Sequence, residues 1–158
     1  MAIYYSSTRG GEKNVTASQA ILKGLAEDGG LFMPDKIPVF DRSFSELAKM
    51  SYQEVAHEVM KLLLPDFTEE ELKDCIARAY DSKFDTEEIA PLVKADGAYY
   101  LELFHGNTIA FQDMALSILP RFMTAAARKN KIDNKPVILT ATSGDPGTAA
   151  KAGFADAE

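Results

Sequence analysis

Two strand–turn–helix units near the C-terminus limit what this chain can fold into. From Tyr99 an apolar run leads through the polar turn "HGNT" into an apolar helix; then "VILTAT", at 137–142, leads through a glycine-rich turn into another helix. Such alternation is typical of a parallel α/β sheet, and the almost wholly apolar second strand indicates cover on both faces. Two units cannot complete a doubly wound sheet. We therefore expect either a fragment, truncated in its catalytic domain, or a last third that needs a partner.

The preceding residues predict mostly helices. A short strand is expected at "IYYSST", followed by helices at "TASQAILKGLAEDGG", "SYQEVAHEVMKLLLP" and "TEEELKDCIARAY". Each helix opens with a capping box, in which a Ser or Thr and a Glu or Gln three residues later satisfy unpaired N–H groups; the pairs are Thr16 with Gln19, Ser51 with Glu54, and Thr68 with Glu71. The first helix is expected to end at Gly29 and Gly30, where glycine suits a left-handed cap.

A domain boundary is predicted near Asp96 and Gly97. A further short helix is expected to begin near Thr86, and the strand pattern starts just after the boundary. The sequence therefore divides into a mostly helical N-terminal domain, residues 1–96, and the start of a parallel α/β domain, residues 97–158, so that the fold class is α/β.

Composition excludes several classes of function. The 158 residues are 46% hydrophobic and 26% charged, as in an ordinary globular protein, and the formal charge of −7 argues against a nucleic-acid partner. Cys75 is the single cysteine, so no internal disulfide can form, and no apolar stretch approaches the ~20 residues that span a bilayer. We expect a cytoplasmic protein without a membrane or nucleic-acid partner. His57 has no Cys, Asp or Glu arrangement of metal-ligand type around it, and His105 alone is weak evidence, so no metal site is predicted.

Both turns that follow the predicted strands have features of ligand sites. Residues 143–147, "SGDPG", lie between strand and helix, where small residues let backbone N–H groups approach an anion. The pattern is neither a dinucleotide-binding nor a P-loop motif, and a simple tight connection explains it equally well. The turn from His105 to Thr108 has the same placement, and Thr108 could cap the next helix. Because open α/β sheets bind ligands at the carboxyl ends of their strands, the two turns together favour a site.

At these residues the sequence resembles the threonine synthases. "LELFHGNTIAFQDMALSIL" is similar to the family segment that ends in Phe-Lys-Asp, and "TATSGDPGTAA" is similar to its Ser-Gly-Asp-Thr-Gly loop. "YYSSTRG" and "ILKGLAEDGGLFMPDKIP" resemble the family's N-terminal leader domain. The resemblance implies a fold type II enzyme, a lyase of threonine biosynthesis that uses pyridoxal phosphate (PLP) to convert O-phospho-L-homoserine and water to L-threonine and phosphate.

The resemblance breaks at the catalytic position. Gln112 stands where the family has the lysine that binds PLP, and a carboxamide can neither form that bond nor act as a general base. Asn107, Pro146 and Thr148 also depart from the family pattern, and Pro146 has no N–H to offer an anion. We therefore expect that this chain alone neither binds PLP nor has threonine synthase activity. The alternative is a non-catalytic binding or interaction protein of threonine synthase ancestry.

The resemblance also implies the lining of a site completed by residues outside this chain. The substrate O-phosphohomoserine would contact Ser143, Gly144 and Gly147, and the cofactor would contact His105, Asn107, Thr108 and Asp145. Gln112 would take the vacant lysine position. The expected partner is a missing C-terminal half or a second copy of the chain.

Overall fold

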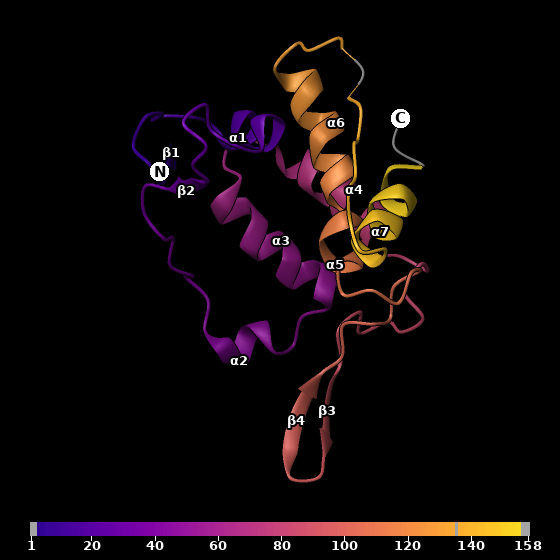
Figure 1. The fold of residues 1–158 in the computed structure, drawn as a ribbon. Helices are drawn as coiled ribbons and strands as arrows, with labels where there is room; N and C mark the ends of the chain where they lie inside the picture. The colour runs from indigo at the N-terminus through magenta and orange to yellow at the C-terminus, as the bar shows by residue number, and fades with distance from the viewer. Residues whose placement is uncertain (1–2, 135, 156–158) are drawn as a thin grey trace.

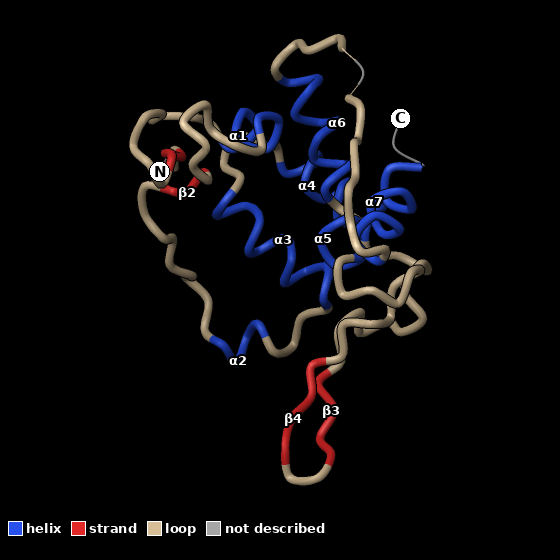
Figure 2. Tube along the Cα trace, viewed as in Figure 1, coloured by secondary structure: helices blue, strands red, loops and turns tan. Residues whose placement is uncertain are grey.

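The computed structural model describes residues 3–134 and 136–155. Eleven helices and strands lie in these ranges (Figures 1 and 2), in the order β1 Tyr5–Ser7, α1 Ala17–Lys23, β2 Phe32–Pro34, α2 Phe44–Leu47, α3 Tyr52–Leu63, α4 Glu69–Ala79, β3 Leu92–Ala95, β4 Ala98–Leu101, α5 Asp113–Leu116, α6 Leu119–Lys129 and α7 Asp145–Ala155. The expected class, a mixture of helix and strand, is confirmed. No helix in the described ranges is long and apolar enough to cross a membrane.

The predicted capping boxes are all present. At α1, α3 and α4 the cap hydroxyl accepts a backbone N–H and the side chain three residues later accepts the N–H of the cap residue. The sequence interpretation missed a fourth box, in which Ser43 and Glu46 begin the short α2. Each such cap stabilises its helix by about 1 kcal/mol.

Two helix predictions were wrong. Helix α1 ends at Lys23, because Gly24 takes a positive φ of 69° there; Gly29 and Gly30 lie in the later turn that leads to β2. No helix begins near Thr86, since residues 81–91 form turns and Ile89 takes a left-handed φ of 61°.

The core lies where α4 packs against α6, with α1, α3 and α5 around it (Figure 1). Phe67 and Phe122 meet edge to face at 5.6 Å between ring centroids, and Leu72 is 2% exposed. Cys75 is buried here, and burial raises the pKa of its thiol to about 11, so the thiol is inert at neutral pH. The core belongs mainly to the first 130 residues.

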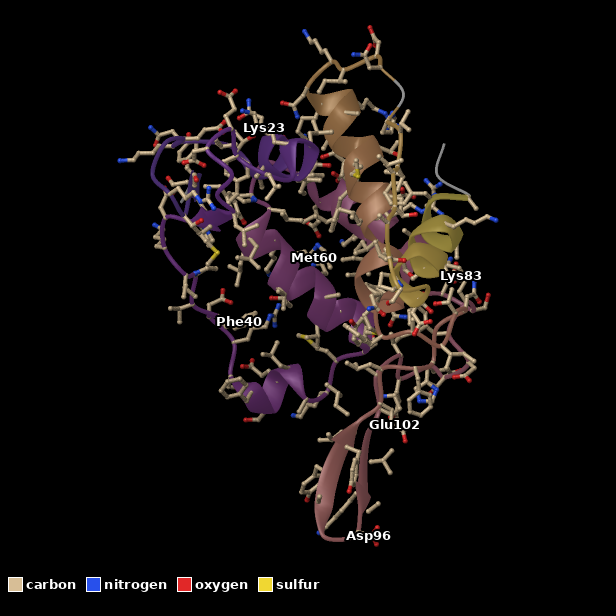
Figure 3. The ribbon with its side chains drawn as sticks, viewed as in Figure 1. Lys23, Phe40, Met60, Lys83, Asp96 and Glu102 are labelled. Atoms are coloured by element: carbon tan, nitrogen blue, oxygen red, sulfur yellow. The ribbon has the colours of Figure 1, made fainter. Side chains whose placement is uncertain are left out.

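Strands β3 and β4 form an antiparallel hairpin that projects from the helices (Figure 1). The prediction of a buried parallel strand from Tyr99 was therefore wrong, and every residue of β3 and β4 is exposed. The turn consists of Asp96 and Gly97, which both have positive φ, as a tight hairpin requires. Figure 3 shows Asp96 at the tip and Glu102 at the base. The predicted domain boundary falls on this turn and stays a prediction.

The second predicted strand, 137–142, is also absent. These residues run past α6 towards α7 without strand pairing (Figure 2), and Leu139 is 95% exposed. Both sheets in the described ranges are antiparallel and two-stranded, β1 with β2 and β3 with β4. Segment 137–142 thus has no neighbouring strand to bond, although its sequence favours one.

Candidate functional site

The two predicted turns meet at an open cavity of about 390 Å³. Its described lining is Leu103, Phe104, Ile109, Ala110, Phe111, Gln112, Ser143, Asp145 and Pro146. The structure thus brings Gln112, from the first turn, together with Ser143 and Asp145 from the second. Helices α5 and α7 hold the turns together: at Gly153 of α7 a Cβ would lie 2.1 Å from the carbonyl oxygen of Leu116, so only glycine allows this approach.

Asp113 organises the first turn. Its side chain is buried and accepts the Thr108 N–H at 2.8 Å and the Thr108 hydroxyl at 2.7 Å. Gly106 packs against the same carboxylate, because a Cβ there would lie 2.5 Å from it. Thr108 therefore binds Asp113 and does not cap the next helix as expected; the cap residue of α5 is Gln112, which makes no side-chain capping bond.

His105 lies outside the lining of the cavity. Its Nδ1 is 2.5 Å from Oδ1 of Asp85 and its Nε2 is 2.9 Å from Oε2 of Glu102, and its ring stacks on Phe104. The Glu102 and Asp85 carboxylates raise the pKa of His105 because they stabilise the imidazolium. His105 thus links Asp85 in the 81–91 loop to Glu102 at the base of the hairpin.

Asn107 also lies outside the lining of the Gln112 cavity. It lines a small separate cavity of about 20 Å³ with Lys83, Asp113 and Arg121 among others. Of the residues expected to contact the cofactor, Asp145 alone therefore lines the larger cavity by Gln112.

The second turn uses its own N–H groups internally. Oγ1 of Thr142 accepts the N–H of Gly144 at 3.2 Å and of Gly147 at 3.1 Å, while Thr148 donates its N–H to the carbonyl of Gly144. Pro146 has no N–H. Gly144 and Gly147 do not line the cavity. Most of the donors that the first turn of α7 could offer an anion are thus already bonded within the chain.

The lining of the cavity combines apolar side chains with polar groups and one charge. Among its described lining residues, Asp145 is the sole ionisable group, and Gln112 and Ser143 add a carboxamide and a hydroxyl. These groups can bind polar atoms, but position 112 supplies no nucleophile and no base. The sequence interpretation missed the supporting residues Asp113 and Thr142; the available signal was a carboxylate beside Gln112 and a hydroxyl just before a glycine-rich turn.

Two further hollows border α3, at about 580 and 360 Å³, and belong to the N-terminal region. His57 lines both, and its Nε2 is buried without a hydrogen-bond partner among the described residues. Those residues contain no group of three metal-ligating side chains. Neither hollow includes a residue of the two turns.

Known proteins resemble the chain along its whole length. Residues 4–80 match the family model described as the threonine synthase N terminus. Threonine synthase from Schizosaccharomyces pombe is 44% identical over 94% of this chain and 30% of its own length, and human threonine synthase-like 2 is 36% identical over 94% and 31%. The chain spans about a third of the length of these relatives.

Solved structures agree with the sequence comparison. PLP-bound threonine synthase from Brucella melitensis superposes with a TM-score of 0.88 at 33% identity, covering 99% of this chain and 34% of that one. Yeast threonine synthase gives 0.81 at 36% identity over 96% and 33%. In sequence and in fold, this chain matches the N-terminal portion of the threonine synthases.

Proposed function

We propose that this chain forms the leader region and one wall of the ligand cavity of a threonine synthase-like protein, and that it does not itself catalyse the family reaction. That reaction is the PLP-dependent conversion of O-phospho-L-homoserine and water to L-threonine and phosphate. The observation that carries the proposal is that Gln112 lines the cavity; the resemblance assigns the family lysine to this position. Loss of a catalytic base alone typically reduces a rate by ~10²–10⁴.

The residues present do not fit PLP. Gln112 cannot bond covalently to the cofactor, and the described lining contains no lysine, arginine or histidine to face a phosphate. The N–H groups of Gly144 and Gly147 already donate to Thr142. The Brucella relative was solved with PLP bound; for this chain we propose that PLP is not held by residues 1–158 alone.

The test is a side-by-side assay of the native chain and Gln112→Lys. Each is incubated with PLP, reduced with borohydride and mapped by peptide mass spectrometry, and each is assayed for threonine formed from O-phosphohomoserine. Ala115→Lys is the matched control, since it adds a lysine at an exposed position of the same helix. We expect no threonine from the native chain and no label on its residue 112. Threonine production by the native chain would overturn the proposal.

A second candidate is a non-catalytic binding protein of threonine synthase ancestry. It is favoured by the concentration of changes in the turns, at Asn107, Gln112, Pro146 and Thr148, while the leader capping boxes are intact. Labelling of Gln112→Lys at residue 112 would favour the first candidate, because only the nucleophile would then be missing. If neither protein is labelled there, binding of another ligand becomes the better account.

We also propose that a further polypeptide covers the exposed apolar residues of the hairpin and of segment 137–142. A C-terminal half of the family type and a second copy of this chain both fit, and sedimentation analysis separates them, since only the second gives a dimer of the isolated chain. Division into domains at 1–96 and 97–158, and a cytoplasmic location suited to a lone reduced cysteine, belong to the same proposal.

A further inference from the structure

The Gln112 cavity carries a negative charge, whereas a site for phosphorylated or carboxylated ligands needs a positive one. Asp145 is exposed and lines the cavity, and the described lining contains no cationic side chain. An anion entering here would meet a carboxylate without a compensating charge. A cation would meet a partner, together with the amide oxygen of Gln112 and the hydroxyl of Ser143 as acceptors.

The helix terminus beside the cavity does not restore an anion site. Asp145 lies in the first turn of α7, so its carboxylate already faces the positive end of the helix dipole. Thr142 accepts the N–H groups of Gly144 and Gly147, and residue 146 is proline. The features that usually bind anions at a helix N-terminus are thus occupied by the chain itself.

The rest of the lining suits an apolar body and an ammonium group. Phe104 is 50% exposed and Phe111 is 63% exposed, large values for aromatic side chains that border a cavity. Aromatic rings attract cations through their negative faces, and lysine-type ammonium groups are typical partners. One face of Phe104 stacks on His105, which leaves the other face and Phe111 for a ligand.

The nearby charges do not reverse this preference. His105 contacts the lining through Phe104, and it is paired with both Asp85 and Glu102. With the imidazole charged, this cluster carries two negative charges and one positive. The net charge of the His105, Asp85 and Glu102 cluster is therefore negative, like the charge of Asp145.

We propose that the cavity between Gln112 and Asp145 binds small ammonium ions that carry an apolar or aromatic body, with Asp145 as the counter-ion and Phe104 and Phe111 as the apolar wall. This inference deepens the second candidate function above and rests on a ligand being bound at that cavity. It does not depend on PLP chemistry. The PLP-labelling assay therefore tests the proposed function, and the binding of the ammonium probe tests this inference independently.

The experiment compares three probes of similar shape on the full 158-residue chain: phenethylammonium, hydrocinnamate and phenethyl alcohol. Binding is followed by NMR shifts of the Gln112 side-chain amide and the Ser143 amide. We expect phenethylammonium to bind up to about fivefold more tightly than the alcohol, because an exposed ion pair is worth at most a factor of about five. Hydrocinnamate should bind more weakly than the alcohol, because its carboxylate would meet that of Asp145.

Asp145→Asn should weaken phenethylammonium about three- to fivefold and leave the alcohol unchanged. Asp133→Asn is the matched control, since Asp133 is an exposed acid that does not line the cavity; it should change nothing. Equal or tighter binding of hydrocinnamate to the native chain would overturn the inference, as would undiminished ammonium binding by Asp145→Asn. Absence of shifts with all three probes would overturn it as well. The probe comparison on the native chain needs no variant to fold.

Discussion

The leader region, residues 3–80, and the last third, residues 92–155, are held together differently. In the leader, each helix of ten or more residues begins with a capping box, and α4 contributes four buried residues to the core. In the last third, the hairpin is exposed on every residue and segment 137–142 pairs with no strand. Helix α6 joins the two regions, because it packs on α1 and α4 and also contacts α5 and α7.

The difference shows which contacts each region needs. The leader satisfies its backbone groups inside this chain, in its capped helices and in the pairing of β1 with β2. A lone two-stranded hairpin is marginally stable in water, and an unpaired extended segment leaves its backbone groups to the solvent. Substitutions in each region test whether the stability of the chain resides in the leader and whether the last third unfolds separately.

The largest difference is expected between two leucines. Leu72→Ala should lower the free energy of unfolding by about 2–5 kcal/mol, because Leu72 is buried in the core and truncation leaves a cavity. Leu139→Ala should change it by less than about 0.5 kcal/mol, because its side chain already faces solvent. Urea unfolding followed by far-UV circular dichroism measures both. A larger loss at Leu139 would show that segment 137–142 is packed in solution.

A smaller effect is expected where α7 meets α5. Gly153→Ala should cost about 1–3 kcal/mol, since the new Cβ would meet the backbone carbonyl of Leu116, which cannot move aside alone. Gly147→Ala is the matched comparison, because its Cβ would meet side-chain atoms and no backbone, the nearest being the oxygen of Thr142 at 2.8 Å. Hydrogen exchange should show Gly153→Ala loosening α5 and α7 while the α3 and α4 amides keep their protection. Equal loosening of both regions would contradict the comparison.

The caps of the leader should have effects of about 1 kcal/mol. Thr68→Ala removes the acceptor of the Glu71 N–H at the start of α4 and should destabilise the protein by about 0.5–2 kcal/mol. Thr68→Ser keeps the hydroxyl and should recover most of that loss. Thermal unfolding of the three proteins measures the series. If Thr68→Ala and Thr68→Ser unfold at the same temperature, the cap hydroxyl contributes nothing to the stability of the leader.

The smallest effects are those of pH, and they should have opposite signs in the two regions. Glu102 and Asp85 raise the pKa of His105 above its ordinary 6.5, so its contribution is complete below 6.5 and is lost as the pH rises through the raised value. The Ser7 hydroxyl and the Gly30 N–H lower the pKa of Asp28 below 3.8, so its contribution is present above 3.8 and is lost as the pH falls through the lowered value.

Residue-resolved hydrogen exchange across this pH range separates the two effects. Mild base should loosen the base of the hairpin, and acid should loosen the turn that leads to β2. His105→Gln and Asp28→Asn should each abolish the response of their own region only. A hairpin that loosens in acid instead would show that His105 is not held as an imidazolium.

The sequence predicted those parts of the fold whose signals are local. The caps at Thr16, Ser51 and Thr68 are recognisable because each partner lies three residues away. The hairpin was equally local, since "ADG" between two apolar runs favours a tight turn, but the apolar run from Tyr99 was assigned to a buried parallel strand instead. The end of α1 was misplaced because the sequence offers glycine at 24 as well as at 29.

Other features depend on residues distant in the sequence. The 137–142 segment has strand-type residues, yet a strand forms only where another strand can bond to it. The meeting of Gln112 with Ser143 and Asp145 was expected from sheet geometry; in the structure it results from the packing of α7 on α5, without a sheet. His105 is directed to Asp85, twenty residues earlier, a pairing that no spacing rule could indicate.

Asp113, and not its neighbour Gln112, determines the conformation of the first turn. The buried carboxylate fixes Gly106 and Thr108, whereas the neighbouring Gln112 contributes no side-chain bond to the cap of α5. The backbone at 112 is therefore set by its neighbour, and the side chain there can be exchanged without rebuilding the turn. Within such a scaffold, one codon decides between an amine and an amide at position 112 while the fold of the turn stays the same.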